Sequence, residues 1–292
     1  MSLQQVANGI FQGSVYALFA LGYTLIFGVL DILNLAHAAI FMAAAAVAWA
    51  LVTTHGWSLW LAFPLVVAGA GMMGVLLDRI AFAPLRRRQS GPLSQMISSL
   101  ALATVIEGVT LGTLGPNLQR FPPSSFPSGS LTVLGVHIDV LQIIVLSISL
   151  LLMIGLQYLL HRTWLGRAMR AIAENQEAAA LLGVPVEAVI ATTFFIASAL
   201  GGASGILYGM SFNAVSFDMG HRIELRGLAI IILGGMGSIP GSLIGGFALG
   251  LVEVISTAWR SDLRDAVAFS VLLVVLLVRP TGLFGTHDER QA

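Results

Sequence analysis

The stretch HRTWLGRAMRAIAENQEAAALLGVP, residues 161–185, stands between two long apolar runs. It carries three arginines and two glutamates, and these side chains make burial in lipid costly. From Leu165 to Leu182 it contains no proline and only one glycine, Gly166, and it is rich in Ala, Leu, Met, Glu and Arg, which favour helix. We therefore expect this stretch to be helical and to lie outside the membrane.

Two local signals divide the stretch into a pair of short helices. Asn175 followed by Glu177 is typical of a helix N-cap with an acidic residue in the first turn. Gly183 followed by Pro185 is typical of a helix stop. We interpret the stretch as a helix pair that another protein can hold; the simpler alternative is a solvated helical loop without a partner.

The composition indicates an all-α, polytopic integral membrane protein. Of the 292 residues, 57% are hydrophobic and 10% are charged, whereas soluble domains carry about 25% charged residues. A membrane-spanning helix needs about 20 apolar residues, and about eight segments qualify, some of them broken. They are Gln5–Leu30, Asn34–Val52, Trp57–Phe82, Pro92–Leu114, Val140–Leu160, Glu187–Phe212, Arg226–Ser256 and Leu263–Phe284.

Several classes of function are excluded by what the chain lacks. The formal net charge of zero gives no indication of a nucleic-acid partner. There is no cysteine, and the histidines show no metal-ligand spacing, so we expect no metal site. Every basic residue is an arginine, and a chain without lysine cannot contain the G-x-x-x-x-G-K-[ST] nucleotide loop. Any ATP chemistry must therefore come from another subunit.

Arginine distribution predicts the orientation of the chain. One cluster of arginines, 79–88, and a second, 162–170, are separated by two predicted spans. Both clusters therefore lie on the same side, which the positive-inside rule makes the cytoplasm. The loop between them, 115–139, faces outward, and we expect a short hairpin around Leu131–Val136.

Two interruptions of apolar segments are candidates for a translocation path. DILNLAHA, Asp31–Ala38, places the polar residues Asn34 and His37 three apart, and GGMGSIPG, Gly234–Gly241, is too rich in glycine for a straight helix. Paired breaks in transporter helices line substrate paths, because the freed backbone groups must face water or substrate. For Asp31–Ala38 an ordinary cytoplasmic turn is an equal alternative; for Gly234–Gly241 the alternative is an interfacial loop.

Other polar or small residues within apolar runs carry weaker signals. Gly201, Gly205 and Gly209 recur every fourth residue and predict a face where helices approach closely. Glu107 and Glu253 could form a proton or substrate site, but we favour carboxyl groups that are neutral or hydrogen-bonded between helices. Ser204 could be an intramembrane nucleophile only with a nearby histidine base, and none is close in sequence.

Four ordered blocks of this sequence resemble the permease subunit of bacterial branched-chain amino acid ABC importers of the high-affinity type. They are GSVYALFALGYTLIFGVLDILNLAHA (13–38), LGRAMRAIAENQEAAALLGV (165–184), LGGMGSIPGSLIGGFALGLVE (233–253) and RPTGLFG (279–285). The resemblance implies one permease domain over residues 1–292, which crosses the bacterial inner membrane several times. The family pattern has glycine where this chain has Ala38, and this departure bears on the identity of the substrate.

The resemblance also implies the machinery around the chain. The partners would be a second, similar permease, two cytoplasmic ATPase subunits that hold the ATP and magnesium, and a periplasmic binding protein. The cytoplasmic segment 161–185 would be the coupling segment, seated in a groove of the ATPase. Its candidate contacts are Arg167, Arg170, Glu174, Asn175, Glu177, Ala178 and Gly183, with Ala179 and Leu182 completing an apolar plug.

The candidate path residues are Asn34, His37, Gly234, Gly235, Gly237 and Ser238. The expected function is passage of branched-chain or other hydrophobic amino acids, without catalysis by this chain. Permeases of the same family for urea, short amides or other small solutes are the first alternative. A proton-coupled secondary transporter, with Glu107 or Glu253 as its relay, is the alternative from another class.

Overall fold

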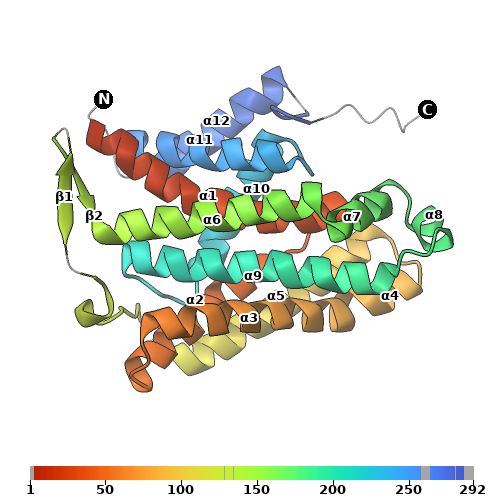
Figure 1. Ribbon diagram of the computed structural model, residues 1–292, viewed down its shortest axis with the longest axis horizontal. Helices are drawn as coiled ribbons and strands as arrows, with labels where there is room; N and C mark the ends of the chain where they lie inside the picture. The colour runs from red at the N-terminus through yellow and green to blue at the C-terminus, as the bar shows by residue number, and fades with distance from the viewer. Residues whose placement is uncertain (1–2, 128, 134, 258–263, 280, 286–292) are drawn as a thin grey trace.

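The computed structural model describes residues 3–127, 129–133, 135–257, 264–279 and 281–285, and helices dominate this part of the chain (Figure 1). The helices are α1 (Leu3–Leu30), α2 (His37–Thr54), α3 (Leu59–Leu77), α4 (Ala83–Arg87), α5 (Pro92–Leu114), α6 (Val140–Arg162), α7 (Trp164–Glu174), α8 (Gln176–Leu181), α9 (Val186–Phe212), α10 (Met219–Gly234), α11 (Ile239–Thr257) and α12 (Arg264–Val278). A π-helical turn, η1 (Asp78–Phe82), joins α3 to α4, and a short 3-10 turn, η2, covers Pro123–Ser125. The strands β1 (Ser130–Val133) and β2 (Val136–Asp139) form one antiparallel hairpin.

Helix α1 is the centre of the bundle. Its side chains Tyr16, Phe19 and Ile26 are fully buried, although α1 as a whole is apolar enough to face lipid. Helices α6, α9, α10 and α11 pack around α1. The contact with α11 is close because glycines meet there: Gly250 lies against the backbone of Gly13. Small residues at such contacts let helix backbones approach in a membrane, where no hydrophobic effect drives helices together.

Seven helices are long and apolar enough to cross a membrane, counting only the residues that the structure describes. They start at residues 3, 37, 59, 92, 140, 186 and 239, and six of them correspond to the predicted segments that precede residue 213. The eighth predicted segment, Leu263–Phe284, contains residues outside the described part, and its helix α12 has 15 residues. The predicted class, an all-α polytopic membrane protein, is confirmed.

The predicted segment Arg226–Ser256 is two helices and not one broken span. Helix α10 begins seven residues earlier than predicted, at Met219, and ends at Gly234; α11 starts at Ile239 and packs back along it. Gly235 and Gly237 have φ of 99° and 80°, which glycine adopts without strain. The GGMGSIPG motif is therefore a tight turn between two helix ends.

The two predicted extramembrane regions lie at opposite ends of the bundle (Figure 1). The hairpin β1–β2 forms as expected near Leu131–Val136, and it lies at the same end as the start of α1. Gln4 fixes it there, because its side chain donates to the carbonyl of His137 at 2.8 Å and accepts from its N–H at 2.8 Å. We call this the hairpin end.

Both arginine clusters lie at the other end, which we call the arginine end. Helix α4, with Arg86 and Arg87, lies at the same end as α7 and α8 (Figure 1). Arg86 pairs there with Asp78 at 2.7 Å and with Glu187, the second residue of α9, at 3.3 Å. The prediction that the two clusters share a side is confirmed by this arrangement.

Candidate functional site

The helix pair α7–α8 has the predicted division and the predicted cap of its second helix; the Thr163 cap of the first helix was not predicted. The Thr163 hydroxyl accepts from the N–H of Gly166 and begins α7, and the Asn175 carboxamide oxygen accepts from the N–H of Ala178 at 2.9 Å and begins α8. Asn175 itself is extended, with φ −160° and ψ 109°, so the helix axis changes direction there. Gly183, with φ 84°, ends the pair as expected.

The surface of this pair differs in part from the expected one. Arg167, Arg170, Glu174 and Glu177 would share one face only in a continuous helix, and the break at Asn175 removes that condition. All the predicted contact residues are exposed: Arg167, Arg170, Glu174, Asn175, Glu177, Ala178 and Gly183. Ala179, expected in an apolar plug, is instead buried within the chain, 2% exposed.

Of the two most exposed apolar side chains of the pair, only one was predicted to contact a partner. Leu181 and Leu182 are 90% and 84% exposed, which is unusual for leucines that are adjacent in sequence and lie on a polar surface. Leu182 was predicted to belong to the apolar plug, and Leu181 was not. The sequence feature that could have predicted the exposure of Leu181 is its position in the last turn of α8, directly before the helix stop.

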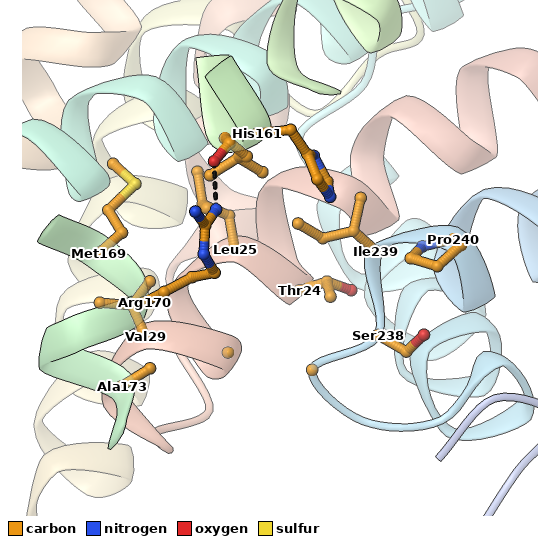
Figure 2. Close-up of a pocket in the computed structure, with 13 residues that line it drawn as sticks. Thr24, Leu25, Val29, His161, Met169, Arg170, Ala173, Ser238, Ile239 and Pro240 are labelled. Carbon is orange, nitrogen blue, oxygen red and sulfur yellow. Dashed lines mark hydrogen bonds between the residues drawn. The ribbon is translucent and has the colours of Figure 1, made fainter. Parts of the chain in front are cut away.

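A cleft of about 280 Å³ separates α7 from the turn between α10 and α11 (Figure 2). Met169 and Arg170 lie on the α7 side, and Ser238 and Pro240 lie on the opposite side. Arg170 donates to the carbonyl of Leu160 at the end of α6, so it also connects α7 to α6. Part of its donor capacity is therefore used within the chain.

The GGMGSIPG turn lies beside this cleft at the arginine end. Gly237 packs against Gly28, two residues before α1 ends, and Gly237 and Ser238 line the cleft. Gly234–Gly241 is thus a turn at the end of the bundle, which agrees with the alternative of an interfacial loop and not with the favoured break inside a helix. Of the predicted path residues, Gly234, Gly235, Gly237 and Ser238 are together at this end, away from His37.

The segment before α2 lies inside the bundle, whereas the GGMGSIPG turn lies at its end. Residues 31–36 contain no helix, yet Ile32 and Asn34 are 5% and 1% exposed. The chain re-emerges as a helix at His37, whose ring lies 4.9 Å from that of Phe19, near the middle of α1. Non-helical backbone at membrane depth is tolerated only when it is buried in protein or lines a water-filled cavity. Of the two alternatives, the structure favours the mid-membrane break.

Asn34 and His37 do not share a helical face, because Asn34 precedes the helix. Its side-chain oxygen accepts from the N–H of Ala36 at 3.2 Å, and its carbonyl accepts from the N–H of His37 at 3.1 Å. The His37 Nε2 atom lies 3.3 Å from the Phe19 carbonyl. The His37 Nδ1 and Asn34 Nδ2 atoms are buried and have no hydrogen-bond partner within the described structure.

Sequence comparisons identify the family. Residues 5–276 match the family model described as the branched-chain amino acid transport system / permease component. The chain belongs to this permease family. It is 32% identical to the high-affinity branched-chain amino acid transport system permease proteins BraD of Pseudomonas aeruginosa and LivH of Escherichia coli, over 98% of this chain and 96% of each relative. It is 33% identical to LivH of Salmonella typhimurium, with the same coverage.

This permease buries an ion pair between Arg226 and Glu253 that the sequence did not predict. The Arg226 Nε atom donates to Glu253 Oε1 at 3.0 Å, and the Gln12 side chain donates to Glu253 Oε2 at 2.6 Å. Glu253 is fully buried, and the pair connects α1, α10 and α11. The interpretation of Glu253 as a carboxyl group hydrogen-bonded between helices is correct, and the pairing gives it a structural role instead of a proton relay.

Ser204 of the permease does not have the surroundings of a nucleophile. Tertiary packing brings His37 against Gly201, one turn from Ser204, which the sequence separation had hidden. The Ser204 hydroxyl, however, is buried and donates to the carbonyl of Gly201 at 2.8 Å. Gly205 packs on the backbone of Phe41, so the predicted face of small residues is confirmed as the contact between α9 and α2.

Proposed function

We propose that this chain is the membrane-spanning subunit of an ABC importer for branched-chain or other hydrophobic amino acids. It works in the bacterial inner membrane with a second, similar permease, two cytoplasmic ATPase subunits and a periplasmic binding protein. ATP and magnesium are held by the ATPase subunits. The full-length similarity to permeases named for branched-chain amino acids supports the substrate class.

The observation that carries the coupling role is the exposed helix pair α7–α8. It presents Leu181 and Leu182, 90% and 84% exposed, at the end of the bundle where the arginines gather. Apolar side chains so exposed mark a protein–protein contact. Helix α7 is held firmly to α6, because Gly166 packs on the backbone of Leu160 and Arg170 donates to its carbonyl. A force on the pair would therefore move α6.

The buried break before α2 supports the path. The Asn34 and His37 side chains keep unpartnered polar atoms at the middle of the bundle, and an apolar core without a function would not retain them. In this proposal the GGMGSIPG turn belongs to the moving parts at the cytoplasmic end, where the cleft beside it gives α7 room to move.

Replacing both Leu181 and Leu182 by aspartate tests the coupling role. We expect the purified variant to retain about a tenth or less of the ATPase subunits that copurify with the wild type, because two carboxylates enter an apolar contact. ATP-driven uptake of leucine into proteoliposomes should fall in the same proportion. Quantitative immunoblots and radiolabelled leucine uptake measure both effects.

The control is Leu118→Asp, which changes an exposed leucine (52%) in the segment between α5 and the hairpin β1–β2, outside the helix pair. It should keep the ATPase subunits bound. Full copurification of the ATPase with the Leu181/Leu182 double variant would refute the coupling role. Leucine uptake by the permease alone, driven by a pH gradient without ATP, would instead establish the secondary transporter, and uptake of urea but not leucine would change the substrate class.

A further inference from the structure

A second cleft, of about 570 Å³, lies at the arginine end beside the one that Arg170 lines. It is lined by the last turn of α1 with Asp31, by parts of α7 and α8, and by the turn between α10 and α11. Val29, Ala173 and Ser238, which Figure 2 labels, line both clefts. We call the second one the α1 cleft, and its volume is within the range of clefts that bind ligands.

The α1 cleft is electrostatically negative. Asp31 is exposed, and it is the one charged residue among the described residues that line the cleft. Its carboxylate forms no ion pair or hydrogen bond within the part of the chain that the structure describes. The carbonyls of Gly28, Val29 and Leu30 accept no hydrogen bond from a described backbone N–H. Carbonyls at a helix C-terminus carry partial negative charge, so this cleft favours a cation.

The neighbouring basic side chains are directed elsewhere. Arg170 and His161 line the adjacent cleft and not this one. The Arg170 guanidinium donates to the carbonyl of Leu160 at the end of α6. Among the described residues, the chain therefore supplies no cation to the α1 cleft.

The wall opposite α7 is held in place by the segment 281–285, which follows α12. The N–H groups of Leu283 and Phe284 donate to the carbonyls of Leu233 and Gly234 at 2.9 Å and 3.0 Å, and so satisfy the end of α10. Phe284 lines the cleft and is 46% exposed. The cleft is thus a formed site with an accessible aromatic ring on its wall.

We propose that the α1 cleft binds an arginine side chain of the cytoplasmic ATPase subunit, an inference that rests on the proposed function. A guanidinium group forms two parallel hydrogen bonds to a carboxylate and stacks on aromatic rings, which a lysine ammonium does less well. Asp31 supplies the carboxylate and Phe284 the ring, and the α1 carbonyls accept further N–H groups.

The position of the cleft identifies the ATPase as the source of this arginine. Gln176, the first residue of α8, lines the cleft, and Leu181 ends the same helix. Five residues of helix span about 7.5 Å. A protein that covers Leu181 therefore also reaches the cleft. Met236 on the cleft wall is 57% exposed, and apolar side chains so exposed mark a protein–protein contact.

This contact gives the ATPase a second connection to the permease. Asp31 begins the non-helical segment 31–36 and lies three residues before Asn34. An ion pair at Asp31 would therefore connect the ATPase to the segment that leads to Asn34 and His37. The helix pair α7–α8 connects the ATPase to α6, whereas Asp31 connects it to the candidate path.

Cross-linking from the cleft wall tests the location of the ATPase. The chain contains no cysteine, so Met236→Cys can be labelled with a benzophenone maleimide in a transporter whose other subunits also lack cysteine. In nanodiscs, light should cross-link this position to the ATPase next to an arginine, which mass spectrometry locates. Leu118→Cys, between α5 and the hairpin, should give no cross-link to the ATPase.

Removing the charge of Asp31 tests the ion pair. Asp31→Asn should speed dissociation of the ATPase from nanodisc-embedded transporter about tenfold, because a charged hydrogen-bond partner is lost. Asparagine tolerates the positive φ of 54° at this position, and Asp31→Gly, which removes any strain there, should give the same result. The control Glu187→Gln removes a 55% exposed carboxylate at the same end and should change the rate less than about twofold.

Two further measurements separate an ion pair from a structural effect. Raising the salt concentration from about 0.1 M to 1 M shortens the screening length from about 10 Å to 3 Å, so the difference between wild type and Asp31→Asn should shrink. The ATPase arginine found by cross-linking, changed to glutamine, should also speed dissociation about tenfold, and the double variant should be no faster than either single one.

Three results would overturn the proposal. Cross-links from Met236→Cys that reach only the permease chains would show that the ATPase does not cover the cleft. Dissociation rates for Asp31→Asn and Asp31→Gly equal to the wild type would exclude an ion pair at Asp31. Additive effects of the two single variants would show that the two side chains do not meet.

These results are also distinct from a failure of the proposed function. Wild-type permease that binds no ATPase, or that takes up leucine without ATP, would refute the function itself. A wild-type transporter that is driven by ATP, together with an Asp31→Asn variant of unchanged ATPase binding, would leave the function intact and refute only the α1 cleft as a contact.

Discussion

Replacing Arg226 by alanine is expected to lower the free energy of unfolding by about 3–5 kcal/mol, the range observed when one partner of a buried ion pair is removed. The variant leaves Glu253, fully buried, with the Gln12 amide as a donor but without the guanidinium that neutralises it. The contact between α10 and α11 should weaken most, since the pair joins these helices. Denaturation of the purified protein in mixed micelles, followed by circular dichroism, measures the change.

The double variant Arg226→Met with Glu253→Met should recover most of the lost stability, because apolar residues of similar volume can replace a buried pair at little cost. Arg222→Ala is the matched control. It breaks a pair whose arginine side chain is 67% exposed, and pairs of this kind contribute about 0–1 kcal/mol. Equal losses for Arg226→Ala and Arg222→Ala would contradict a special role for the buried pair.

Replacing Gly205 by alanine is the second change with a large expected effect. A Cβ atom at Gly205 would overlap the backbone carbonyl of Phe41, and backbone cannot move aside as a flexible side chain can. Helices α9 and α2 must therefore separate, at a cost of about 1–3 kcal/mol or more. His37 packs on the same face of α9 at Gly201, so leucine uptake should fall together with stability.

The control variant is expected to change the stability in the opposite direction. Gly112 lies in α5 with nothing within 4 Å of a Cβ atom built on it. Alanine there should raise stability by about 0.5–1 kcal/mol, because alanine favours helix over glycine. The same micelle denaturation compares the two variants, and a stable, active Gly205→Ala protein would show that α2 and α9 are not held as closely as the structure indicates.

The sequence predicted local structure correctly wherever residues close together in the chain decide the conformation. Asn175 caps α8 and Gly183 ends it, as predicted, because a cap needs only the backbone within three residues. The hairpin near Leu131–Val136 and the faces of small residues on α9 follow similarly from short-range rules. The position of the helix pair outside the membrane was predicted from its charges, since arginines and glutamates are costly in lipid, and its helical conformation was predicted from its helix-forming residues.

Predictions that depended on depth in the bundle were less accurate. Asp31–Ala38 and Gly234–Gly241 look alike as interruptions of apolar runs, yet the first lies at the level of Phe19 and the second at the end of α1 beside Gly28. A hydropathy pattern records how apolar a residue is but not which helix lies next to it. The start of α10 at Met219 was missed because polar residues in its first two turns resemble a loop.

The sequence by itself determined the all-helical membrane class, the absence of a nucleotide loop, the arginine end and the helix pair, because each follows from composition or from contacts a few residues apart. Only the tertiary structure decided that His37 meets Gly201, that Arg226 neutralises Glu253, and that Glu107 joins His221 and Glu224. These groups come from helices far apart in the chain. Their contacts depend on how whole helices pack. A charge without a partner is costly in the apolar interior, so a buried charged side chain is held next to an oppositely charged one.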